Sequence, residues 1–100
     1  TIIGMYALAY SDDKGGPTVT ISGEIISIDL ENSTVGINEL KDPRAYVYVA
    51  EYIVITPSVK LTQDAREIGL SDLKIRDKVK VEYAVNSSGN LKPIGISLER

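Results

Sequence analysis

The chain has few residues that could do catalytic chemistry. Its 100 residues include no Cys and no His, which excludes thiol nucleophiles, thiolate metal sites and imidazole general bases. The carboxylates that lie close together in sequence are Asp12 and Asp13, Asp29 and Glu31, and Asp64 and Glu67. None of these sets has the ligand spacing of a calcium loop, and none stands beside an evident nucleophile. We therefore expect solvated turn residues, with no metal, no cofactor and no enzymatic activity.

Three tyrosines, Tyr46, Tyr48 and Tyr52, offer a stacking surface of the kind on which small barrels bind single-stranded nucleic acid. The alternative is that these rings cover core or an interface. A nucleic-acid site needs surrounding positive charge, but the net charge is −3, and the basic stripe over residues 74–80 is interleaved with carboxylates. We interpret that stripe as a solvated strand face and expect no nucleic-acid partner.

Two Asn-x-Ser/Thr sequons are present, at Asn32 and Asn86. Both fall in predicted turns between strands, where a bulky glycan is tolerated. The alternative is chance, because Asn, Ser and Thr are common turn residues. If the sequons carry N-linked glycans, the chain lies outside the cell.

From residue 18 onward the hydrophobic pattern is typical of β-strands. Thr18–Leu30 carries its apolar residues on one parity up to Ile25 and on the other from Ile26, which indicates a β-bulge just after Gly23. Further strands are predicted at Thr34–Leu40, Ala45–Thr56, Lys78–Val85 and Leu91–Leu98. Both faces of Ala45–Thr56 are apolar, so we expect that strand to be covered on both sides for part of its length.

The stretch Thr62–Ile75 is the helical candidate. Asp64 is placed to cap a short helical turn over Ala65–Ile68, which Gly69 ends, and a further turn is expected at Ser71–Leu73. Five strands, with a coiled first strand and a short helix between the third and the fourth, follow the order of an OB-type barrel. The predicted fold class is all-β: a five-stranded OB-like small barrel or sandwich with one short helix, plus an N-terminal extension strand.

Residues 23–99 resemble a widespread family of small, secreted, OB-like β-barrel domains of unknown function. The resemblance is carried by Gly23–Asp29, Ile55–Leu61, Leu73–Val81 and Gly89. The family usually has a glycine near Ile75–Asp77, where this chain has none. The resemblance implies a secreted barrel and transfers no catalytic residue.

The first ten residues, TIIGMYALAY, are apolar on both faces of an extended strand. Three interpretations compete. The segment is the end of a signal peptide with a small-x-small site at Ala7–Ala9, a strand folded on its own barrel, or a donor strand that completes the sheet of a neighbouring molecule. The donor-strand side chains would be Ile2, Ile3, Met5, Tyr6, Ala7, Leu8 and Tyr10. A hinge formed by Gly15, Gly16 and Pro17 would separate them from the barrel.

The segment resembles the donor strand of strand-exchange pilus subunits, and this interpretation leads to a function. It divides the chain into a donor-type strand over 1–10, a hinge over 11–17 and an OB-like barrel over 18–100. Copies joined head to tail would form a homopolymer, an extracellular filament or pilus at the cell surface with no membrane insertion. The alternative is a monomeric secreted or periplasmic OB-like module that binds a ligand or partner, with the N-terminal strand folded on its own barrel.

Overall fold

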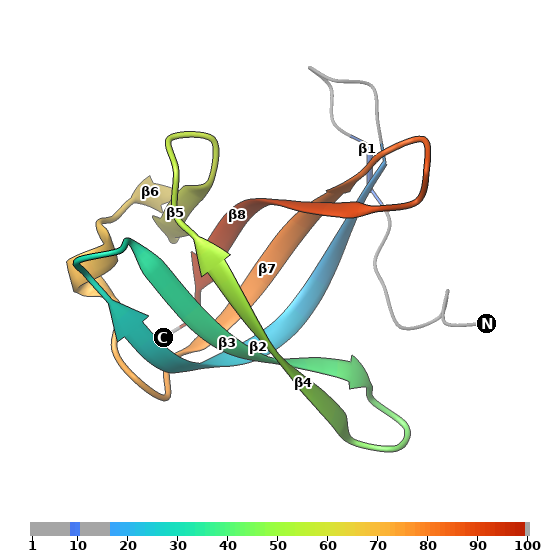
Figure 1. Ribbon diagram of the computed structural model, residues 1–100, viewed down its shortest axis with the longest axis horizontal. Helices are drawn as coiled ribbons and strands as arrows, with labels where there is room; N and C mark the ends of the chain where they lie inside the picture. Colours follow the sequence, from blue (N-terminus) through green and yellow to red (C-terminus); the bar gives the residue numbers. More distant parts are fainter. Residues whose placement is uncertain (1–8, 11–16, 100) are drawn as a thin grey trace.

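The chain folds into one coiled β-sheet, seen in a computed structural model that describes residues 9–10 and 17–99 (Figure 1). The strands are β1 (Ala9–Tyr10), β2 (Pro17–Asp29), β3 (Thr34–Asp42), β4 (Val47–Val54), β5 (Lys60–Gln63), β6 (Arg66–Glu67), β7 (Lys78–Val85) and β8 (Leu91–Leu98). A 3-10 turn, η2 (Leu70–Asp72), precedes β7. The strand order is β4-β3-β2-β7-β8-β5-β6, and β1 pairs with β2 outside this path. The predicted all-β class is confirmed.

The five strands predicted from the hydrophobic pattern are β2, β3, β4, β7 and β8, and the last two have the predicted bounds. The bulge in β2 is also present, because the β2–β3 register shifts between Ile25 and Ser27. Ile25 is fully buried, whereas Ile26 is 39% exposed. The shift lets one long strand pair with β7 over its first half and with β3 over its second half.

The barrel closes through β5, which pairs with β8 in parallel, Lys60 opposite Gly95 and Gln63 opposite Leu98. Because β5 follows β4 in the chain, the connection over residues 55–59 joins the β4 end of the sheet to the β5 end. The enclosed core consists of apolar side chains from both sides of this closure. Its buried members are Val19, Ile21, Ile25, Val35, Ile37, Ile53, Val59, Leu61, Leu73, Val79, Val81, Tyr83, Ile96 and Leu98.

The expected helical turn over Ala65–Ile68 is wrong. Asp64 and Ala65 both have positive φ, 52° and 67°, and they form the tight turn of a hairpin in which Gln63 pairs with Arg66. Two consecutive positive φ angles are what a two-residue hairpin turn requires. Asp64 therefore stands inside a β-turn and caps no helix. The helical turn lies further along, at η2, within the region where a second turn was expected.

Part of the N-terminal segment is described. Ala9 pairs with Thr18, and Tyr10 pairs with Pro17, in an antiparallel ladder within the same chain. The intramolecular alternative expects this pairing. Pro17 is the first residue of β2, a strand position that tolerates a missing N–H. The other candidate donor residues, Ile2, Ile3, Met5, Tyr6, Ala7 and Leu8, and the hinge residues Gly15 and Gly16 lie outside the described residues. Within the described part, no helix has the length and apolar character to cross a membrane.

The turn before β7 has a backbone conformation that favours glycine, although this chain has no glycine near Ile75–Asp77. Arg76 has a φ of 77°, the left-handed region that glycine enters without steric cost. Its N–H donates to the carbonyl of Ile25 at 2.7 Å, and the Ile25 N–H donates to the carbonyl of Asp77 at 2.9 Å. These two bonds fix the turn to β2 at the bulge and hold an arginine where a glycine would fit.

We expect Arg76→Gly to raise the free energy of unfolding by about 0.5–1 kcal/mol, because glycine removes the Cβ strain at positive φ. Urea denaturation measures the change. The matched control is Lys74→Gly, in the same exposed turn but without positive φ, which we expect to lower stability. Equal destabilisation by both substitutions would contradict the prediction.

Candidate binding site on the β3–β4 hairpin

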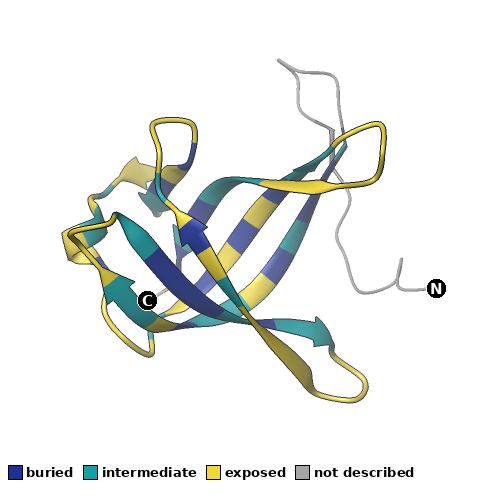
Figure 2. Ribbon diagram, viewed as in Figure 1, coloured by how far each residue is buried: buried dark blue, intermediate teal, exposed yellow. Residues whose placement is uncertain are grey.

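Strand β4 is the most exposed of the long strands. Seven of its eight positions are exposed or half-exposed, and only Ile53 is buried (Figure 2). The exposed large side chains on this strand are Val47 at 46%, Tyr48 at 50%, Val49 at 40%, Tyr52 at 65% and Val54 at 57%. The expectation that β4 is covered on both sides is therefore wrong. Its apolar residues form a surface, which we call the β4 surface.

The register with β3 divides the β4 side chains between two faces. Val49 lies opposite Glu39, and Ile53 lies opposite Val35, so these side chains are on the barrel side. Tyr48, Ala50 and Tyr52 alternate with them and are on the outer side. The hairpin extends away from the barrel (Figure 1), which explains why even barrel-side residues such as Val49 stay partly open to solvent.

Tyr52 packs over Gly36, its register partner on β3. A Cβ added to Gly36 would lie 2.8 Å from the Tyr52 Cε1 atom and would overlap the Ser27 hydroxyl. The absence of a side chain on Gly36 therefore lets the Tyr52 ring approach the β3 backbone closely. Tyr52 is thus oriented while most of its surface remains exposed.

The tip of the hairpin presents a third tyrosine. The Asp42 carboxylate accepts hydrogen bonds from the N–H groups of Arg44 at 3.0 Å and Ala45 at 3.4 Å, which fold the turn. Tyr46 follows with a φ of 55° and is 76% exposed. The structure therefore brings Tyr46, Tyr48 and Tyr52 together on one hairpin, as the stacking and interface interpretations both require.

The long edge of β4 has no second strand beside it among the described residues, because β4 pairs only with β3. Its unpaired N–H and C=O groups can therefore accept an added strand. The edge at the other end of the sheet is different, since β6 has two residues and both are charged. Short, charged edges resist strand addition, so the two ends of the sheet differ in their capacity to bind.

A buried carboxylate lies on β3 at the point where the pairing of β3 with β2 ends. Glu39 is fully buried, accepts a hydrogen bond from the Tyr83 hydroxyl, and has its Oε1 atom 3.0 Å from Lys41 Nζ. Lys41 also lies 3.8 Å from Glu51 of β4. This cluster, which we call the Glu39 cluster, was missed in the sequence. The signal in the sequence is parity, because Glu39 falls on the same face of the strand as the core residues Val35 and Ile37.

We expect Tyr83→Phe to lower the free energy of unfolding by about 1–3 kcal/mol, because it removes a donor from a fully buried carboxylate. Urea denaturation of the full chain measures the loss. Tyr48→Phe, which removes a hydroxyl from a ring that is 50% exposed, is the control and should change stability by less than about 0.5 kcal/mol. An equal response from the two variants would show that the Tyr83 hydroxyl does not stabilise Glu39.

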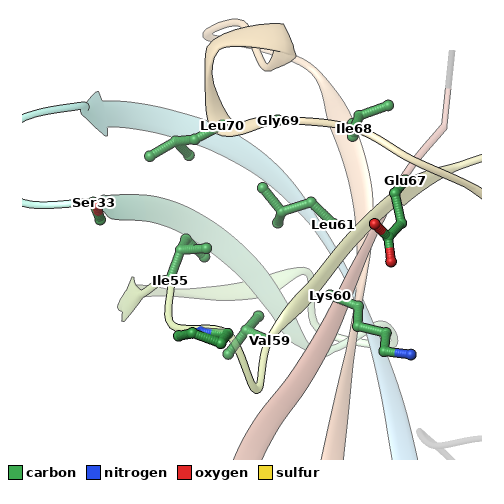
Figure 3. Close-up of a pocket in the computed structure, with 10 residues that line it drawn as sticks. Ser33, Ile55, Val59, Lys60, Leu61, Glu67, Ile68, Gly69 and Leu70 are labelled. Atoms are coloured by element: carbon green, nitrogen blue, oxygen red, sulfur yellow. The ribbon is translucent and has the colours of Figure 1, made fainter.

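A shallow apolar groove lies at the other end of the barrel, between η2 and the connection over residues 55–59 (Figure 3). Its volume is about 340 Å³. Ile55, Leu61 and Leu70 face this space (Figure 3), while Lys60 and Glu67 add charge to its lining. Ile55 and Leu70 also pack against the core. The groove is therefore an opening onto the end of the barrel core.

The other predicted positions do not converge on a site. Asn32 and Asn86 are both exposed in turns, as a glycan acceptor requires, and their glycosylation stays a prediction. The side-chain amide of Asn32 donates to Asp29 at 2.7 Å, and this bond, with help from the backbone N–H of Asn32, holds the pKa of Asp29 below its usual value. The stripe over 74–80 carries surface ion pairs such as Lys78–Glu24 and Lys80–Glu99.

Comparison with known proteins supports the fold. No protein-family model and no curated protein matches the chain. Solved structures of CusF from Escherichia coli do match. The silver(I) form has 21% identity and a TM-score of 0.54, covering 88% of this chain and 99% of that one. The apo form has 19% identity and a TM-score of 0.54, covering 92% and 99%. A copper(II) form of a CusF variant has 22% identity and a TM-score of 0.54, covering 83% and 92%.

At this identity the likeness establishes a small all-β, OB-like barrel and no more. CusF is seen with silver(I) and copper(II), so the donor atoms available in this chain bear on whether it could bind those ions. Silver and copper favour thiolate, thioether and imidazole ligands. This chain has no Cys, no His and a single Met, Met5, which lies outside the described residues. The described residues also contain no group of three or more His, Cys, Asp or Glu side chains that could hold a metal. The donor set does not fit these metals.

We expect silver(I) and copper(II) to leave the thermal midpoint of this protein unchanged to within about 1 °C, because a ligand raises the midpoint only when it binds the folded state. Differential scanning calorimetry with an excess of each ion over protein measures this, and calcium is a control for nonspecific cation effects. A rise of several degrees with silver or copper but not with calcium would contradict the prediction.

Proposed function

We propose that the chain is a secreted or periplasmic, non-enzymatic binding module that holds an extended segment of a partner protein along the free edge of β4. The observation that carries this proposal is a long edge strand with five exposed apolar or aromatic side chains. Exposed apolar side chains of this kind mark interaction surfaces, and an added strand satisfies the backbone groups of the edge.

Charge favours a protein partner over a nucleic acid. The only charged residue of β4 is Glu51, whose carboxylate lies 3.8 Å from Lys41. Lys41 in turn lies 3.0 Å from Glu39, so its charge is matched within the hairpin. Phosphate binding needs a positively charged groove beside the stacking rings. The pocket beside Tyr48 contains Lys78, but Glu24 lies 3.5 Å from the Lys78 Nζ atom and balances its charge. An extended peptide with aromatic or branched side chains is the matching chemistry.

The compartment is part of the proposal. The family resemblance implies secretion, and the exposed positions of Asn32 and Asn86 are compatible with export. A location at the cell surface is a finer prediction that belongs to the filament hypothesis below.

A filament built by donor strands is the second candidate function. The free edge of β4 favours it, because a head-to-tail polymer needs an acceptor edge on every subunit. Ala9 and Tyr10 pair with β2 of the same chain. This pairing favours the first candidate, because the end of the proposed donor segment is bound within its own molecule. We therefore rank the binding module first.

The test is retention of partner proteins by the immobilised full chain. We expect the wild type to retain specific proteins from an extract of the cells that produce it, and Tyr48→Ser/Tyr52→Ser to lose them, because the variant removes the two outer rings of the β4 surface. Mass spectrometry identifies the retained proteins. The matched control is Ile75→Ser/Leu91→Ser, which removes side chains that are 51% and 41% exposed elsewhere.

Circular dichroism first establishes that all variants are folded. Identical sets of proteins on the wild type and on the tyrosine variant would overturn the proposed function. Loss on both double variants would show that retention depends on general surface hydrophobicity and not on β4, which also overturns it.

A further inference from the structure

The β4 strand carries side chains of matching type on the two sides of its residue Ala50. The sequence from Val47 to Ile53 reads VYVAEYI, in which two of the three position pairs about Ala50 match in side-chain type and the third pairs Val49 with Glu51. Tyr48 and Tyr52 stand two places on either side of this centre. One place further out, Val47 and Ile53 match as branched aliphatic residues. In an antiparallel pair of identical strands centred on Ala50, each of these residues meets its counterpart.

We infer that the partner of β4 is β4 of a second copy, paired antiparallel about a two-fold axis with Ala50 opposite Ala50. This inference rests on the proposed function and names the partner. In this register the outer face carries two Tyr48–Tyr52 pairs, one on each side of the alanines. Directly opposed aromatic residues stabilise antiparallel ladders, and the small Ala50 side chains leave room for both pairs.

The barrel-side face is compatible with the same register. Val47 meets Ile53 of the second copy, and Val49 meets Glu51. The two Glu51 carboxylates lie diagonally across the ladder and not directly opposite, which avoids the repulsion of like charges in a direct pair. Each Glu51 also has Lys41 of its own chain at 3.8 Å. A register centred on Glu51 would bring the two carboxylates face to face, so charge disfavours that neighbouring register, and the matching of Tyr48 with Tyr52 favours the one centred on Ala50.

The edge lacks most of the features that usually prevent such pairing. Natural edge strands are protected by lysine, proline, bulges, short length or inward-pointing charges. The eight residues of β4 include no lysine and no proline, and its one barrel-side charge, Glu51, has Lys41 of the same hairpin at 3.8 Å. The register shift between β3 and β4 falls between Leu40 and Asp42, at the very start of β4. The rest of the edge is regular. Because the hairpin extends away from the barrel (Figure 1), two copies can meet along β4 with their barrels apart.

The test uses opposite charges at the symmetry centre of the full-length chain. Ala50 is exposed, so Ala50→Lys and Ala50→Glu leave the monomer folded, but each places like charges directly opposite in the dimer. We expect each variant to self-associate about fivefold more weakly than the wild type in sedimentation equilibrium. An equimolar mixture of the two variants should recover dimers, because Lys and Glu then face each other. Ile75→Lys and Ile75→Glu, at an exposed site away from β4, should behave as the wild type.

Each alternative outcome overturns the β4–β4 dimer. A wild type that stays monomeric over the whole concentration range removes it, while retention of other proteins through Tyr48 and Tyr52 would leave the proposed function standing. Association that is unaffected by either Ala50 substitution points to another interface, including the donor strand. Weakening by both substitutions without recovery in the mixture would mean that Ala50 does not lie opposite itself.

Discussion

The way the barrel closes determines what the rest of the molecule can present. Closure depends on the four residues of β5, which pair in parallel with β8. The eight residues of β4 come before this closure and, among residues 9–10 and 17–99, pair on one side only. A barrel closed along the whole of β4 and β5 would have no such edge. Because closure is confined to β5, the structure keeps a stable core and still exposes one long strand.

The Glu39 cluster connects these two parts. Glu39 belongs to β3, Tyr83 to the barrel strand β7, and Glu51 to β4, with Lys41 between the two carboxylates. A buried carboxylate is tolerated only when its oxygens have partners. The partners of Glu39 come from one barrel strand and from the hairpin itself, so the cluster links the hairpin to the barrel.

Local sequence patterns predicted much of this architecture. They did not predict how the barrel closes, because closure depends on pairing between strands that are distant in sequence. The parity change at Ile25 and Ile26 was visible because a bulge moves apolar residues to the other face. The turn at Asp64 and Ala65 was misinterpreted because Asp is also a common helix cap, and only the pairing of Gln63 with Arg66 distinguishes the two. The apolar residues of β4 were correctly located but wrongly assumed to be covered. Alternation shows that a strand has two apolar faces, but not whether another element covers them.

The residues of the candidate site could be predicted from the sequence, but the contacts around them could not. Tyr46, Tyr48 and Tyr52 stood out by spacing, and the structure places them on one hairpin. The space that Gly36 leaves under Tyr52 could not be seen without the β3–β4 register. The turn at Arg76 shows the reverse. A missing glycine suggested an altered backbone, yet two hydrogen bonds to Ile25 hold the glycine-like conformation.

The protruding hairpin also implies an uneven distribution of stability along the chain. Only Ile53 of β4 is buried, whereas β7 places Val79, Val81 and Tyr83 in the core. Segments with few buried contacts open in local fluctuations that leave the remaining fold intact. The outer half of the hairpin is therefore expected to open at a lower free-energy cost than the barrel, and its amide hydrogens to exchange first. Such a strand can rearrange its pairing while the rest of the domain stays folded.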